Sequence, residues 1–144
     1  MNISQQEYSS MVRRVSPNST IVKDCIGAFF AGGLICIIGQ ALTDTYLLWT
    51  SGDLTIARSM TSISLVFLSA FFTVCGWYDN IAKRAGAGTL VPITGFANSV
   101  VSPAIEFQSE GFISGLGAKM FVIAGPVIVF GTLASVLYGL FLLF

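Results

Sequence analysis

The sequence predicts an all-α integral membrane protein with about four hydrophobic helical segments, of which the third is broken or re-entrant. Of its 144 residues, 54% are hydrophobic and 10% are charged, and the mean hydropathy is +0.82. Soluble domains, in contrast, carry about 25% charged residues. The length accommodates three or four spans of about 20 residues in one membrane domain. The net charge is zero and no basic run occurs, which argues against nucleic acid as a partner.

Residues 1–22 form a polar N-terminal arm ahead of a single membrane domain at residues 23–144. Ser4 and Glu7 have the spacing of a capping box and predict the start of an amphipathic helix. Apolar residues then recur with helical periodicity on one face: Tyr8, Met11, Val12 and Val15. We expect this helix to end at residues 16–18 and to lie in the headgroup layer or dock on a partner protein. A short solvated arm is the alternative interpretation.

The first predicted span covers residues 24–43, and its core at 26–38 carries no charge. Small residues recur along it and predict close helix packing: Gly32 or Gly33, Cys36 and Gly39. Gln40 is the one strongly polar side chain of this span. Most intramembrane glutamines bond a neighbouring helix, and a pore-facing role is the alternative.

The second predicted span covers residues 60–78, after an interfacial stretch and a turn at residues 51–53. The interfacial stretch holds Asp44, Tyr46 and Trp49. Trp77 and Tyr78 form a second interfacial pair, typical of an aromatic belt. Basic residues precede the first span and follow the second, whereas the loop between the spans has only Arg58. By the positive-inside rule, the N-terminus and the loop at residues 79–85 are cytoplasmic.

The segment at residues 86–111 is apolar but contains three residues predicted to bend it, Pro92, Gly95 and Pro103. In hydrocarbon, irregular backbone survives only where protein or a water-filled cavity surrounds it, so broken helices are typical of transport pathways. We expect a half-helix that begins near Thr94 or Asn98 and stops before Pro103, because the residue before proline disfavours helix.

Polar side chains of this segment predict a solute pathway, because a pore needs several weak polar contacts. The candidates are Thr94, Asn98, Ser99, Ser102 and, from the first span, Gln40. Asn98 and Ser102 are four residues apart and share a helix face. The alternative is that these side chains hold the broken helix to the first two spans.

Two acids follow the broken segment. Glu106 and Glu110 predict an acidic mouth that attracts a cation such as calcium when subunits assemble, and solvated loop acids are the alternative. The last segment, residues 119–144, is the longest apolar run, and Gly125 and Pro126 predict a kink near its start. The side of the membrane that holds the C-terminus depends on whether residues 86–111 cross or re-enter.

No catalytic or metal-binding pattern is present. The chain has no histidine, and its three cysteines lack the spacing of a metal site. We therefore expect no enzymatic activity, no metal and no cofactor. Because three or four short helices do not easily enclose a pore for anything larger than water or a bare ion, a homo- or hetero-oligomer in membrane lipid is expected.

Three stretches resemble the stage V sporulation protein A (SpoVA) family of spore-forming bacteria. They are GGLICIIGQ at residues 32–40, AGAGTLVPITGFANSVVSPAIEFQSEG at 85–111 and FVIAGPVIVFG at 121–131. The resemblance covers nearly the whole chain from residue 23. The polar arm and the GFANS motif at residues 95–99 are similar to the AC branch of the family rather than the AEb branch.

The resemblance implies a protein of the spore inner membrane. Such a protein would help move dipicolinic acid, as its calcium chelate, into the developing spore and out at germination. It further implies a tension-responsive channel that acts with AEb and the soluble AD protein, but it supplies no site residues. A non-conducting scaffold that recruits other sporulation proteins through the arm is the alternative. A coupled transporter is disfavoured, since no ionisable residue lies inside the apolar cores.

Overall fold

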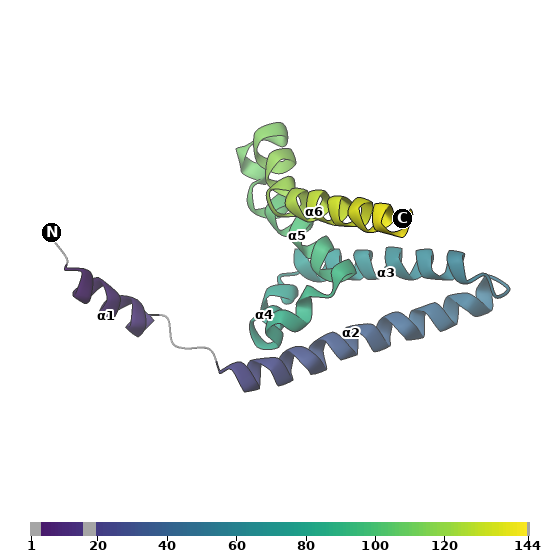
Figure 1. Ribbon diagram of the computed structural model, residues 1–144, viewed down its shortest axis with the longest axis horizontal. Helices are drawn as coiled ribbons and strands as arrows, with labels where there is room; N and C mark the ends of the chain where they lie inside the picture. Colours follow the sequence, from purple (N-terminus) through teal and green to yellow (C-terminus); the bar gives the residue numbers. More distant parts are fainter. Residues whose placement is uncertain (1–3, 16–19, 144) are drawn as a thin grey trace.

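The computed structural model describes residues 4–15 and 20–143, apart from the side chains of three residues in the first helix, and the regular structure of this part is entirely helical (Figure 1). The elements are α1 (Gln5–Val15), α2 (Ile21–Trp49), α3 (Leu54–Val74), α4 (Trp77–Ala85), the 3₁₀ helix η1 (Gly86–Leu90), α5 (Pro92–Glu106), the 3₁₀ helix η2 (Gln108–Glu110), the π-helix η3 (Phe112–Gly117) and α6 (Ala118–Leu143). The all-α prediction is confirmed. The predicted end of the first helix at residues 16–18 lies outside the described residues.

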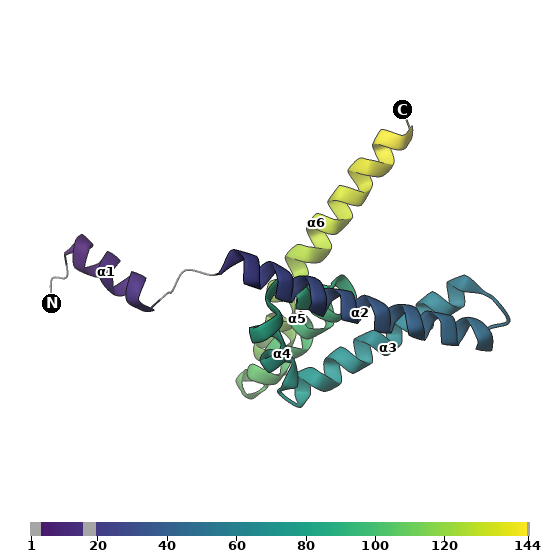
Figure 2. The ribbon, with the colours of Figure 1, turned by 90° about the horizontal axis from the view of Figure 1, so that it is seen from below.

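The capping box at the start of α1 forms as predicted. The Ser4 N–H donates to Glu7 Oε2 at 3.0 Å, and the Glu7 N–H donates to Ser4 Oγ at 3.3 Å. These hydrogen bonds, first the backbone one and then the one from the Ser4 hydroxyl, lower the pKa of the Glu7 carboxyl. All four residues of the predicted apolar stripe are exposed, and α1 stands apart from the other helices (Figures 1 and 2).

Helices α2 and α3 form an antiparallel hairpin that is longer than the predicted spans. The predicted turn is confirmed: Ser51 and Gly52 have φ of 53° and 89°, and the Asp53 carboxylate caps α3 by accepting from the N–H groups of Thr55 and Ile56. Hydroxyl pairs join the two helices at Thr43–Thr61 (3.0 Å) and Tyr46–Ser64 (2.7 Å). The far ends of the two helices diverge, and η1 and α4 lie there (Figure 1).

Three segments are long and apolar enough to cross a membrane: α2, α3 and residues 112–143. The predicted third segment does not qualify as a span. With 15 residues and a rise of 1.5 Å per residue, α5 is about 22 Å long, whereas the hydrocarbon core is about 30 Å thick. The structure therefore supports a broken third element but not a count of four spanning helices.

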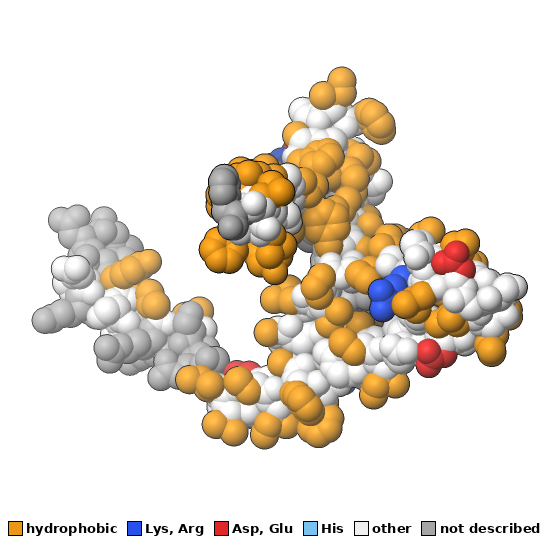
Figure 3. Space-filling model, turned by 45° about the vertical axis from the view of Figure 1, so that its right-hand side comes forward, with side chains coloured by type: hydrophobic (Ala, Val, Ile, Leu, Met, Phe, Trp, Pro, Cys, Tyr) orange, Lys and Arg blue, Asp and Glu red, His pale blue; other side chains and the backbone are white. Residues whose placement is uncertain are grey.

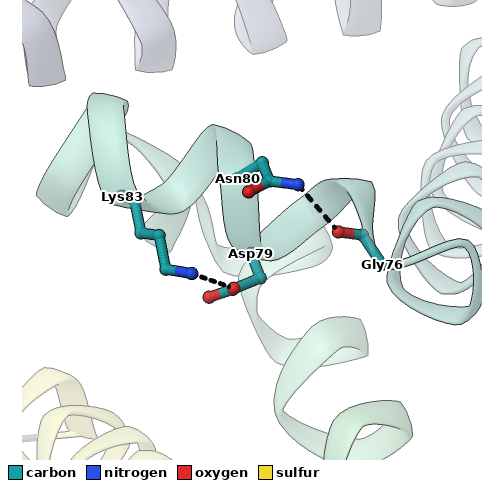
Figure 4. Close-up of polar contacts among 4 residues, drawn as sticks. All are labelled: Gly76, Asp79, Asn80 and Lys83. Atoms are coloured by element: carbon teal, nitrogen blue, oxygen red, sulfur yellow. Dashed lines mark hydrogen bonds and ion pairs between the residues drawn. The ribbon is translucent and has the colours of Figure 1, made fainter.

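Helix α3, which corresponds to the second predicted span, ends earlier than predicted, at Val74. The reason is that Gly76 adopts the left-handed conformation (φ 71°) and redirects the chain into α4. Of the predicted interfacial pair, Tyr78 is buried within the protein, and its hydroxyl donates to the Thr89 carbonyl at 2.7 Å. On the exposed side of α4, Lys83 forms an ion pair with Asp79 at 2.6 Å, and the Asn80 amide donates to the Gly76 carbonyl (Figure 4).

The 3₁₀ helix η1 lies directly against α2. A Cβ atom on Gly88 would collide with the backbone of Ala28, and one on Gly32 would lie 3.5 Å from the Gly88 carbonyl oxygen. The predicted small-residue ridge on α2 is thus in contact at Gly32 and also at Gly39, which faces Leu65 of α3. Gly33 and Cys36 are not part of this contact, since Gly33 has open space around it and Cys36 is exposed.

The break in the third element lies at Val91, between η1 and α5. The predicted stop before Pro103 is wrong, since α5 continues through Pro103 to Glu106, whereas its start at Pro92 lies two residues from the predicted start near Thr94. Pro92 suits the first helical turn, where its missing N–H has no partner to lose. Pro103 leaves one carbonyl of the preceding turn without its usual partner, a defect that protein-packed membrane helices tolerate.

After Gly111 (φ 105°), a π-helical turn leads into α6, which extends away from the hairpin (Figure 2). The helix continues unbroken past Gly125 and Pro126. It packs against α5, and Ala124 is its one fully buried residue within the described part. Hydrophobic side chains spread over every part of the surface drawn in Figure 3, with few charged ones between them. In this arrangement α5 lies between the hairpin and α6.

Candidate functional site

A cleft of about 480 Å³ lies between α5 and the first turns of α6. The cleft is lined by three of the predicted pathway residues, two of the predicted bend residues and one of the predicted mouth residues. A lysine that was not predicted lines it as well. The lining comprises Leu90, Gly95, Asn98, Ser99, Ser102, Pro103, Glu106, Phe107, Lys119, Val122 and Ile123. The structure therefore gathers most of the polar side chains of α5 on a single face, opposite apolar residues of α6.

Asn98 is bonded at one end and open at the other. Its Oδ1 accepts a hydrogen bond from the Thr73 hydroxyl of α3 at 2.9 Å, while no hydrogen bond from its amide nitrogen occurs among the described residues. Asn98 and Ser102 line the α5–α6 cleft and also an adjoining hollow of about 150 Å³ beside α4. The predicted shared face of these two residues is thus present, and Asn98 also joins α5 to α3.

The two serines of the cleft differ in their availability to a solute. Ser99 Oγ donates to the Phe96 carbonyl of its own helix at 2.7 Å, which leaves its oxygen as an acceptor. Ser102 is exposed, and its hydroxyl makes no hydrogen bond within the part of the chain that the structure describes. Together with the Asn98 amide, these groups offer both donors and acceptors at separate points along one face.

Two predicted pathway residues lie elsewhere. Thr94 is buried, and its carbonyl accepts a hydrogen bond from Ser69 of α3 at 2.7 Å, so it belongs to the α3–α5 contact. Gln40 is exposed on α2, and its amide donates to Asp44 one turn along at 2.8 Å. Neither lines the cleft.

Charged groups of both signs lie at one end of the cleft. Glu106 is the last residue of α5, and Lys119 lies in the first turn of α6, with its Nζ 4.4 Å from the centre of the Phe107 ring. Glu110 does not share a helix face with Glu106, because α5 ends before it and Glu110 lies in η2. Among the described residues, no ion pair within 4.0 Å joins Lys119 to either acid. Lys119 was not among the residues predicted to form a site, although it is the only charge near the start of a long apolar segment.

The three predicted bend residues act at different places. Pro92 is the first residue of α5, and Pro103 lies inside the helix. At Gly95 a Cβ atom would lie 3.1 Å from the Leu90 Cα and from the Thr89 carbonyl oxygen, so the missing side chain lets η1 fold back onto the start of α5. The described residues hold no group of three or more Cys, Asp or Glu side chains arranged for a metal ion.

Comparison with known proteins gives a family match over most of the chain. The profile of the family described as "SpoVAC/SpoVAEB sporulation membrane protein" matches residues 24–141. The chain is 43% identical over 136 residues to stage V sporulation protein AC of Bacillus subtilis (strain 168), an alignment that covers 94% of this chain and 91% of that protein. No solved structure matches.

Proposed function

Because the chain belongs to the SpoVAC/SpoVAEB family of sporulation membrane proteins, we propose that it is a subunit of a channel in the inner membrane of the spore. The proposed solute is dipicolinic acid or its calcium chelate, taken up during sporulation and released in germination. The chain would provide a passive pathway and would not act as an enzyme. The observation that carries this proposal is the cleft between α5 and α6.

The chemistry of the cleft suits a small dicarboxylate. Asn98, Ser99 and Ser102 offer several weak contacts and no deep ionic trap, which is what conduction requires. Lys119 at the end of the cleft would attract a carboxylate, and Glu106 would attract the calcium of the chelate. The apolar wall from α6, with Val122 and Ile123, suits the face of an aromatic ring.

A complete pore requires further chains. The cleft is open, and most of α6 is exposed in the isolated chain, so α5 and α6 supply one wall only. We propose a homo-oligomer or a hetero-oligomer with the AEb protein, to which the soluble AD protein would bind.

The proposed orientation places the N-terminus on the cytoplasmic side, which is the spore core. Two basic residues support this orientation, Lys23 at the start of α2 and Arg84 at the end of α4. They lie at the same end of the hairpin, because the Arg84 carbonyl packs against Gly27 of α2, 3.4 Å from the position of a Cβ atom there. Arg58 lies near the opposite, turn end of the hairpin. Basic residues therefore gather at one end of the hairpin, in accord with the positive-inside rule.

The unequal contacts of α5 suggest how tension or a partner could open the pathway. Two hydrogen bonds tie α5 to α3, at Ser69–Thr94 and Thr73–Asn98. Among the described residues, no hydrogen bond joins α5 to α6. Apolar helix contacts exchange for lipid at little cost, so we propose that gating moves α6 while α5 stays on the hairpin.

Flux of calcium dipicolinate from liposomes that contain the purified full-length chain, with and without hypo-osmotic shock, tests the proposal. We expect release that depends on shock, and slower release with Asn98→Leu, which removes a polar group from the cleft. Loss of one hydrogen bond of about 1 kcal/mol corresponds to roughly fivefold in rate. If the chain alone releases nothing, the test is repeated with AEb, and no release there either would contradict the proposal.

Thr73→Val is the matched control. It removes the α3–α5 hydrogen bond to Asn98 but leaves the Asn98 amide in the cleft. Slower release with Asn98→Leu and near-normal release with Thr73→Val would assign the effect to the pathway. Equal losses would show that Asn98 acts by holding the two helices together.

The second candidate function is a non-conducting scaffold, which one observation favours. The apolar stripe of α1 is exposed, with Val15 82% and Tyr8 64% accessible, and α1 stands apart from the membrane helices (Figure 1). Deletion of residues 1–16 separates the two functions. The scaffold predicts loss of partner recruitment with no flux from liposomes under any condition, and the channel predicts that flux survives.

A further inference from the structure

Two adjoining hollows form a groove between α2 and α4, and none of their lining residues lines the α5–α6 cleft. The first is an open mouth lined by Gly27, Asn80 and Arg84 among others. The second is a more enclosed cavity of about 220 Å³ that reaches Ile38 of α2 and Leu65 of α3. Ala31 and Ile81 line both hollows, so a polar mouth and an apolar interior adjoin each other at these two residues.

The interior offers nothing to a polar ligand. Its apolar walls come from α2, α3 and α4, and its few polar side chains are already bonded to the protein. Tyr78 donates to the Thr89 carbonyl, and Ser69 donates to the Thr94 carbonyl, both at 2.7 Å. The Thr89 hydroxyl donates to the Gly86 carbonyl at 3.0 Å. The cavity is therefore suited to a hydrocarbon chain.

The mouth carries a cationic side chain, that of Arg84, which has no ion-pair partner among the described residues. Lys83, its neighbour on α4, is paired with Asp79 (Figure 4), whereas Arg84 forms no ion pair within the described residues. Arginine binds phosphate through two parallel N–H donors. The mouth thus presents the group that recognises a phosphate, at the entrance of a cavity that accepts an apolar chain.

The direction of the groove matches the depth of a lipid. Lys23 and Asp24 mark the polar end of α2, and Gly27 at the mouth follows one turn later. The interior extends along α2 to Ile38, which is 11 residues, or about 16 Å at the helical rise. A phosphate at Arg84 would lie at headgroup level, and a chain in the cavity would run toward the membrane centre.

We propose that this groove binds one anionic phospholipid, with its phosphate on Arg84 and one acyl chain in the cavity between α2, α3 and α4. The bound chain would fill the space between the diverging ends of the α2–α3 hairpin and η1. This site is separate from the α5–α6 cleft, so evidence against the channel proposal would not count against lipid binding here. Basic pockets between membrane helices on the cytoplasmic side are known to recognise anionic headgroups.

The test uses the full-length chain, delipidated in a mild detergent and titrated with phosphatidylglycerol or phosphatidylcholine. Native mass spectrometry counts the retained lipid, and the midpoint of thermal unfolding reports stabilisation. We expect phosphatidylglycerol to bind about fivefold more tightly, the factor expected for one basic residue at an anionic surface. Arg84→Gln should remove this preference, and Lys83→Gln, which changes the net charge equally, should keep it. Both side chains are exposed, so neither variant disturbs a buried group.

Two further measurements test whether an acyl chain occupies the cavity. Ala31→Leu adds bulk at a residue that lines both the mouth and the cavity and should weaken retention of the long-chain lipid at least fivefold, with far-ultraviolet circular dichroism used to confirm folding. Inorganic phosphate should not displace the lipid. Displacement by phosphate would identify a phosphate site that takes no lipid chain. Equal binding of the two lipids, or equal losses in Arg84→Gln and Lys83→Gln, would overturn the proposal.

Discussion

Substitution of Gly88 by alanine tests the contact that positions the broken segment. A Cβ atom at this position would lie 2.8 Å from the Ala28 Cα and 3.0 Å from its carbonyl carbon, and closer still to its carbonyl oxygen. Carbon atoms in favourable contact are about 3.5–4.0 Å apart, so η1 would have to move away from α2 by about 1 Å.

Overpacking of this kind costs about 1–3 kcal/mol. The atoms that collide belong to the Ala28 backbone, so no side chain can rotate to relieve the contact, and a compensating Ala28→Gly change should not restore stability. The movement would also strain the Tyr78–Thr89 hydrogen bond, which anchors η1 to α4. We expect the cost to fall in the upper part of this range.

The assay is reversible unfolding of the detergent-solubilised chain by titration with sodium dodecyl sulfate, followed by far-ultraviolet circular dichroism. Gly33→Ala is the matched control, because it adds the same methyl group to α2 where nothing lies within 4 Å. A helical glycine replaced by alanine gains up to about 1 kcal/mol, so this variant should unfold at the same or a higher detergent fraction. Equal midpoints for the Gly88 and Gly33 variants would refute the close contact between η1 and α2.

Three further outcomes are expected. Lys119→Gln should slow dipicolinate flux about fivefold at low salt and less at high salt, because a single charge is screened by added ions; a salt-independent effect would exclude electrostatic attraction. The capping hydrogen bonds lower the pKa of Glu7, so their stabilisation of α1 is present above the ordinary glutamate pKa and is lost as the pH falls through the lowered value. Cα chemical shifts of residues 5–15 that stay equally helical while the Glu7 carboxyl is protonated would contradict this. Three spanning segments place the two termini on opposite sides, and labelling of both terminal cysteine tags from one face of sealed vesicles would contradict that topology.

The parts of the fold that the sequence predicted correctly depend on composition or on short-range geometry. An apolar excess with few charges is sufficient to indicate a membrane protein. The capping box at Ser4 and Glu7 and the turn at residues 51–53 formed as expected, because each is decided within four residues of the chain. Helix ends at Trp49 and Val74 were misplaced by several residues, since hydropathy reports where lipid can lie and not where the helical backbone stops.

The predicted helix end before Pro103 was wrong because local rules do not tell which of two prolines ends a helix. Pro92 and Pro103 both carry the signal for a helix end, but only the first coincides with a place where η1 packs on α2 and the backbone must turn. Gly88 and Ala28, which are in contact, are 60 residues apart in the chain, and the sequence near Pro92 does not indicate this contact.

Lys119 was missed for a related reason. In the sequence it marks the edge of an apolar run, and such residues usually face the headgroup layer. Its place in the cleft follows from the π-helical turn at Phe112–Gly117, which brings the start of α6 back over the end of α5. The buried Gly115 permits this return, because a Cβ atom there would collide with the Phe107 carbonyl.

Asn98 shows why two opposed interpretations of a polar residue can both hold. The sequence left open whether this side chain faces a lumen or joins helices, as if one excluded the other. A primary amide has an acceptor at one end and donors at the other, and in this chain the acceptor bonds Thr73 while the residue also lines the cleft. The hydrogen bond to α3 occupies the acceptor end of the amide, and the amide nitrogen makes no hydrogen bond within the described residues, so it stays available as a donor. One amide can therefore hold α5 on α3 through its oxygen while its nitrogen can still donate to a carboxylate, which is why Thr73→Val and Asn98→Leu are expected to affect flux differently.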